Sequence, residues 1–154
     1  MEYRALRERE FETTLRVLQA YPEDKINMKP ARKSRTAGEL AMVLASEERV
    51  IGILIETGAT NPQLSKLQVL PTMTEIITAW QEAVTVNNVL LTQLSEADFD
   101  KVVHFYGMTI PLGDALWIEL LDHIHHRGQF SVYLRLAEAR VPPIYGPTAD
   151  EPMG

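Results

Sequence analysis

Four segments of this 154-residue chain repeat apolar residues at the spacing of an amphipathic helix, and none shows a strong strand pattern. The four segments cover about residues 2–21, 36–58, 72–94 and 112–139. Stretches rich in proline, glycine, asparagine or serine separate them. Because each apolar stripe must be buried against another element, the pattern predicts an all-α four-helix bundle. The length suits one domain, residues 1–154.

Local signals set some of the helix ends. Thr36 with Glu39 three residues later forms a capping box, in which each side chain satisfies one free backbone N–H at a helix start. The last helix should stop at "VPP", since proline cannot continue a helix. The proline-rich tail that follows should be extended, and its Ile144 and Tyr145 are expected to dock on the bundle.

Composition excludes several classes of function. The net charge of −6 argues against a nucleic-acid binder and against a polybasic membrane contact. No cysteine is present, so thiolate metal ligands and a cysteine nucleophile are excluded. The N-terminus is charged from residue 2, unlike a signal peptide, and the longest apolar run, "VIGILI", is too short to span a bilayer. A cytoplasmic protein is therefore expected.

The stretch "LLDHIHHRGQFSVYLR" in the last helix holds three of the four histidines, His123, His125 and His126. Polar residues here fall on a row of three- and four-residue steps that is otherwise apolar. Burying carboxylates is costly unless they are paired, hydrogen-bonded or bound to metal, so this row predicts a functional or structural polar cluster. Its members are Ala115, Glu119, Asp122, His126, Gln129, Phe130 and Tyr133.

Two other helices carry a polar residue on their apolar stripes: Glu47 on the second and Asn87 on the third. One interpretation is a divalent metal site. Asp122 and His126 are four residues apart, so both side chains point the same way, and Glu47 is the candidate third ligand. Three protein ligands leave coordination positions for water or substrate.

The catalytic candidates beside this site are Glu119 and His125. A helix cannot aim three near-adjacent histidines one way, so His123 and His125 are expected behind the ligands or at the surface. The alternative interpretation is a metal-free polar network that fixes the helix register, formed by Asp122, His126, Glu47 and Arg127.

The element "HIHHRGQFSVYLR", followed by "VPPIYGPTADEP", resembles the DinB-like superfamily of putative metalloenzymes, and "TAGELAMVLASEERV" resembles its second-helix segment. The resemblance covers nearly the whole chain. It implies an up-down-down-up bundle with one long crossover, often a homodimer. It also implies a divalent metal such as zinc, nickel, manganese or iron, held by three histidines. Characterised relatives include S-transferases that use a low-molecular-weight thiol, isomerases and hydrolases.

Matched residue by residue, only one of the family's three histidine ligands is present. His126 matches the second histidine of the last helix, Asp122 stands in place of the first, and Val43 occupies the second-helix position. Asp122 is still a metal ligand by type, and Glu47 lies one turn beyond Val43. The resemblance thus implies a metal-dependent thiol transferase or hydrolase with a modified site. The alternative is a metal-free member that binds a small molecule or a protein.

Overall fold

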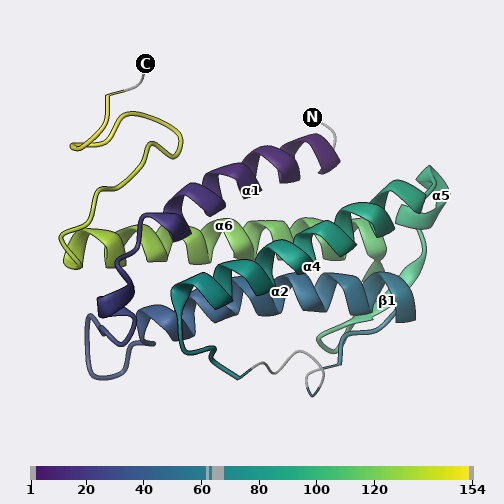
Figure 1. Ribbon diagram of the computed structural model, residues 1–154. Coiled ribbons are helices and arrows are strands. Elements are labelled where there is room, and N and C mark those ends of the chain that lie inside the picture. The colour runs from purple at the N-terminus through teal and green to yellow at the C-terminus, as the bar shows by residue number, and fades with distance from the viewer. Residues whose placement is uncertain (1–2, 62, 64–67, 153–154) are drawn as a thin grey trace.

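The computed structural model, described here for residues 3–61, 63 and 68–152, confirms the predicted helical bundle (Figure 1). Its long helices are α1 (Tyr3–Gln19), α2 (Ala37–Thr57), α4 (Met73–Gln93) and α6 (Leu112–Leu136). Helices α1 and α6 run one way, and α2 and α4 run the other. The connection from α2 to α4 therefore crosses back along the bundle, which is the up-down-down-up topology with a long crossover.

The capping box at the start of α2 is present as predicted. The Thr36 hydroxyl accepts a hydrogen bond from the Glu39 N–H at 3.0 Å, and the Glu39 carboxylate accepts one from the Thr36 N–H at 2.6 Å. Gly58 ends the helix with a φ of 72°, a left-handed conformation that glycine adopts without a steric penalty. Local sequence therefore determines both ends of the helix that carries Glu47.

Shorter elements join α4 to α6. They are α5 (Glu96–Phe99) and a hairpin of β1 (Val102–Phe105) and β2 (Met108–Pro111), paired with His104 opposite Thr109. The turn residues Tyr106 and Gly107 both have positive φ, 45° and 83°, as a two-residue hairpin turn requires. Backbone hydrogen bonds of 2.8 Å join His104 to Gly58 and Thr60, so the hairpin is held against the end of α2.

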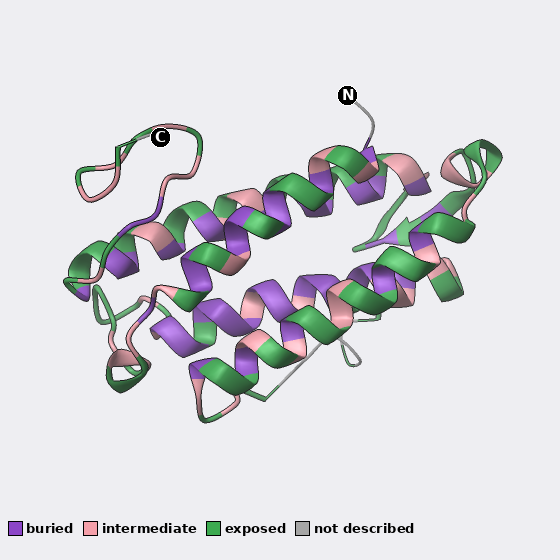
Figure 2. Cartoon of the chain, turned by 45° about the horizontal axis from the view of Figure 1, so that its top comes forward, coloured by how far each residue is buried: buried purple, intermediate pink, exposed green. Residues whose placement is uncertain are grey.

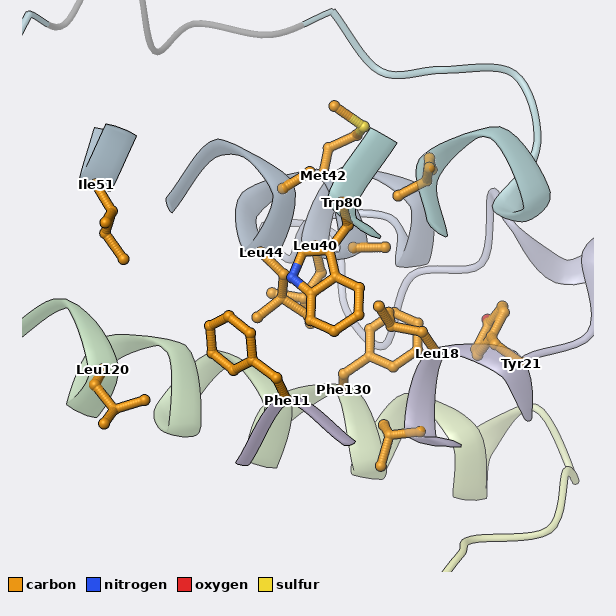
Figure 3. Packing of buried hydrophobic residues seen from close by; sticks show 14 of the residues in the cluster. Phe11, Leu18, Tyr21, Leu40, Met42, Leu44, Ile51, Trp80, Leu120 and Phe130 are labelled. Atoms are coloured by element: carbon orange, nitrogen blue, oxygen red, sulfur yellow. The ribbon is translucent and has the colours of Figure 1, made fainter. Parts of the chain in front are cut away.

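Buried residues of all four long helices face one another along the bundle axis, and exposed residues face outward (Figure 2). Apolar side chains make up most of this buried set. At the centre Phe11, Trp80 and Phe130 pack with Leu40 and Leu44 (Figure 3). A 3-10 turn, η1 (Glu23–Lys25), follows α1. Within the described residues, no helix combines the length and apolar character needed to cross a bilayer.

The C-terminal tail is irregular from residue 139 to residue 152 and lies on the bundle, as predicted. The Tyr145 hydroxyl accepts a hydrogen bond from Arg127 Nη2 at 2.7 Å and donates one to Glu10 Oε2 at 2.8 Å. Ile144 packs against the core. Through Tyr145 the tail therefore links Glu10 of α1 to Arg127 of α6, the residue that follows His126.

Candidate metal centre

The structure brings Glu47 of α2 together with Asp122 and His126 of α6. Each offers one donor atom, and the three atoms lie within 4.8 Å of one another. His126 Nδ1 is 2.5 Å from Glu47 Oε1 and 3.7 Å from Asp122 Oδ2, so this nitrogen faces both carboxylates. The Glu47 and His126 side chains are 8% and 12% exposed, whereas that of Asp122 is 53% exposed. The cluster therefore lies at the edge of the core and opens to solvent at Asp122.

This donor set fits a divalent ion. One imidazole nitrogen and two carboxylate oxygens are common ligands of zinc, manganese and iron. With metal–ligand bonds of about 2.0–2.2 Å, tetrahedral ligand atoms lie about 3.3–3.6 Å apart. Asp122 Oδ2 is already near that separation from His126 Nδ1. Glu47 and His126 would have to move apart by about 1 Å and release the proton between them.

Electrostatics favour charge at this centre. Burial raises the pKa of the Glu47 carboxyl, but contacts with His123 and His126 outweigh burial and hold that pKa below its usual value. The hydrogen bond with Glu47 raises the pKa of His126, against the effect of burial. The side chains therefore form an ion pair in which Glu47 is a carboxylate, the protonation state that a metal ligand needs.

His123 lies behind Glu47 and is 1% exposed. Its Nδ1 is 3.3 Å from Glu47 Oε2, and its Nε2 is 2.9 Å from the Thr14 hydroxyl. The Phe11 ring contacts it, with 4.5 Å between centroids. Of the two positions expected from sequence, His123 therefore takes the buried one, beside the second oxygen of Glu47; the two atoms make no hydrogen bond at this geometry.

The predicted inward row on α6 is only partly correct. Glu119 is buried, but the Asp122 side chain is half exposed and Gln129 is exposed. The buried stripe of the helix is rotated toward the row Leu116, Leu120, His123, Arg127, Phe130 and Leu134. Asp122 consequently sits at the rim of the bundle rather than inside it.

The catalytic candidates Glu119 and His125 lie beside the cluster. Both line a surface hollow of about 520 Å³ between α6 and the hairpin, together with Asp122. His125 is exposed, and its Nε2 is 2.7 Å from the Gln129 amide nitrogen. Glu119 is 3% exposed and makes no hydrogen bond to any described residue. The other walls are mostly apolar: Phe105, Tyr106, Met108, Ile118 and Leu121.

Burial, with the nearby negative charges of Glu47 and Asp122, raises the pKa of Glu119 to about 8. The unfolded carboxyl titrates near 4.5, so folding takes up a proton between these pH values, and stability falls as pH rises through this window. Glu119→Gln removes the buried charge. The unfolding free energy of the variant minus that of wild type should therefore be about 2–4 kcal/mol larger at pH 9 than at pH 5.

Urea unfolding at both pH values, with a chelator present, measures this gain. Glu82→Gln, which changes an exposed glutamate of α4, is the matched control and should follow wild type. Equal pH dependence in Glu119→Gln and wild type would show that Glu119 is ionised in the fold.

Two buried ion pairs lie near the centre, and three of their four residues, Arg7, Glu48 and Glu10, were not among the polar residues singled out from the sequence. Arg7 of α1 pairs with Glu48 of α2, and both side chains are at most 2% exposed. Asn87, predicted to point inward, is buried and donates to Glu48 rather than to Glu47, at 2.8 Å. The second pair, Arg127 with Glu10 at 2.6 Å, underlies the docked tail. Apolar periodicity gives no signal for Glu48, because it neighbours Glu47 in sequence.

The fold and the site define a helical-bundle protein with a carboxylate–histidine cluster between α2 and α6. The model of the DinB family matches residues 3–153. The chain therefore belongs to the DinB family. Over 62 residues it is 37% identical to YrdA, an uncharacterised protein of Bacillus subtilis, a match that spans 40% of this chain and 37% of YrdA.

Solved structures share the fold. A DinB-like protein of Bacillus cereus superposes with a TM-score of 0.76 at 24% identity, and the Bacillus subtilis DinB-like protein YjoA with 0.72 at 20%, each covering 88% of this chain and 91% of the other. A mycothiol-dependent maleylpyruvate isomerase superposes with 0.69 at 15% identity, covering 83% of this chain and 59% of the isomerase. At these identities the likeness establishes the fold alone.

Proposed function

We propose that this chain is a metal-dependent enzyme of the DinB family, a transferase that uses a low-molecular-weight thiol or a hydrolase. One observation carries the proposal: donor atoms of Glu47, Asp122 and His126 converge within 4.8 Å at the edge of a hollow. The thiol-dependent isomerase among the fold's neighbours supports the thiol branch. A bound divalent ion would supply a Lewis acid that lowers the pKa of a thiol or water.

Side chains around the metal centre would then have separate roles in the reaction. The apolar walls of the hairpin hollow bind the substrate and exclude water from its reacting end. His125 accepts the proton of the thiol or water at Nε2, after the Gln129 amide that donates to this nitrogen has moved away. Glu119, whose pKa burial raises, donates a hydrogen bond in its protonated form to the oxygen on which negative charge develops. We expect the protein to act as a cytoplasmic homodimer with a single domain over residues 1–154.

A second candidate function follows from the same contacts. Glu47 Oε1 already has a partner in His126 at 2.5 Å, and His123 lies 3.3 Å from the other oxygen, so these side chains can form a polar network without an ion. In that case the hollow binds a small molecule or a protein partner and performs no metal chemistry. Metal content separates the two functions.

Dialysis against zinc, nickel or manganese, followed by elemental analysis, tests the proposal. The enzyme should retain about one equivalent of at least one metal per chain. Asp122→Asn keeps the size of the side chain but removes its charge, and it should lower metal affinity about 10-fold or more. Less than about a tenth of an equivalent of every metal after reloading would rule out the enzyme and leave the binding module.

A further inference from the structure

A second hollow, of about 640 Å³, lies at the other end of the same α6 face. Its walls come from the loop that precedes α2 and from the second half of α6. The Tyr133 hydroxyl donates to the Arg35 carbonyl oxygen at 2.9 Å, so the loop is fixed against α6. The lining residues are Pro30, Lys33, Ser34, Arg35, Leu40, Gln129, Val132 and Tyr133.

The loop concentrates positive charge in an acidic protein. Four of the 15 lysines and arginines fall within residues 29–35, although the net charge of the chain is −6. Two of these cations, Lys33 and Arg35, line the hollow and are exposed. Across the part of the chain that the structure describes, neither forms an ion pair or a side-chain hydrogen bond. Glu39, the nearest acid in sequence, is occupied by its cap on the Thr36 N–H. Both cations are thus available to an anion.

The two hollows flank the candidate metal centre. Gln129 lines the basic hollow and contacts His125, which lines the hairpin hollow, and His126 lies between them on α6. From His126 to Tyr133 the helix rises about 10 Å, the length of a tripeptide-sized molecule.

We propose that the basic hollow binds the carboxylate end of a small cosubstrate whose other end reaches the metal centre. This rests on the proposed function, which requires a cosubstrate beside the ion. Charge fixes its orientation. Lys33 and Arg35 attract a carboxylate to the loop, whereas the hollow beside the metal centre has no lysine or arginine among its lining residues. The hairpin hollow, with its apolar walls, is left for the second substrate.

Calorimetric titration with S-methylglutathione tests the site separately from the metal, because the blocked sulfur cannot bind an ion as a thiolate. The wild-type apoprotein should bind this dicarboxylate with a dissociation constant of about 1 mM or lower. Arg35→Ala should weaken binding about 5–10-fold, since a charge-assisted hydrogen bond is lost. The diethyl ester of S-methylglutathione should bind no better to wild type than to Arg35→Ala.

Arg32→Ala is the matched control: it removes the same charge from the same loop, but Arg32 does not line the hollow. It should change affinity less than about 2-fold. Equal losses in both variants, or no binding by wild type, would overturn the inference. Metal retention, measured on the same samples, should be unchanged in Arg35→Ala. If binding depends on Arg35 but no metal is retained, the subsite stands and the proposed enzyme fails.

Discussion

Replacing His126 by alanine should abolish the rise in melting temperature that a divalent metal gives the wild-type protein. His126 Nδ1 is the donor atom that faces both carboxylates, so its loss leaves two oxygens on different helices with no nitrogen between them. At a metal concentration 100 times its dissociation constant, binding stabilises the wild type by about 2.7 kcal/mol. The variant should lose nearly all of this increment. Thermal melts with metal and with chelator measure it.

For each variant, the melting temperature with metal must be compared with that of the same variant with chelator. His126→Ala also changes the stability of the apoprotein, because it leaves Glu47 without one partner. His125→Ala is the matched control, since it removes a neighbouring histidine that lies at the surface. That variant should keep the full metal-dependent rise. If His126→Ala keeps it too, the ion binds elsewhere and the candidate centre is not the metal site.

Replacing Arg7 by methionine should destabilise the fold by about 3–5 kcal/mol, because it leaves the Glu48 carboxylate buried without its cation. Burial already raises the pKa of Glu48, and the charge of Arg7 opposes that rise. The guanidinium also lies 4.2 Å from the centroid of the Phe11 ring, so its loss removes a cation–π contact. Urea unfolding at pH 7 measures the change.

A double variant separates the buried charge from packing. Adding Glu48→Gln to Arg7→Met removes the unpaired charge yet keeps an oxygen that accepts from the Asn87 amide. The double variant should recover about 1–3 kcal/mol. Arg135→Ala, which breaks an exposed ion pair with Asp150, should shift the midpoint far less. A small effect of Arg7→Met would show that Glu48 is not left as a buried unpaired carboxylate when Arg7 is removed.

The fold followed from sequence because its signals are local. The capping box at Thr36 and the glycine at residue 58 determine the ends of α2 within one turn. The apolar stripes of the other long helices place Phe11, Trp80 and Phe130 in the core. Each of these features depends on residues at most a few turns apart, which periodicity can detect.

The rotation of α6 was harder to predict, since polar residues occur on all of its faces. The stripe Leu116, Leu120, His123, Arg127 and Phe130 also follows four- and three-residue steps, but it contains a histidine and an arginine. Their burial depends on Thr14 and Glu10, more than 100 positions away. Sequence spacing identified Glu47, Asp122 and His126 as a group that the structure does bring together, but not the exposure of Asp122 or the support from His123.

The separation of these partners along the chain also determines when the site forms. Glu47 and His126 are 79 positions apart, and Thr14 and His123 are 109 apart. Closing such loops costs chain entropy before any contact repays it, so the helices form first and these pairs last. The contacts of the Tyr145 hydroxyl with Arg127 and Glu10 join residues 18 and 135 positions apart, so they too form after the helices. Because its ligands come from α2 and α6, the centre can hold an ion only after these two helices have packed together, and its occupancy would therefore report that the bundle has assembled.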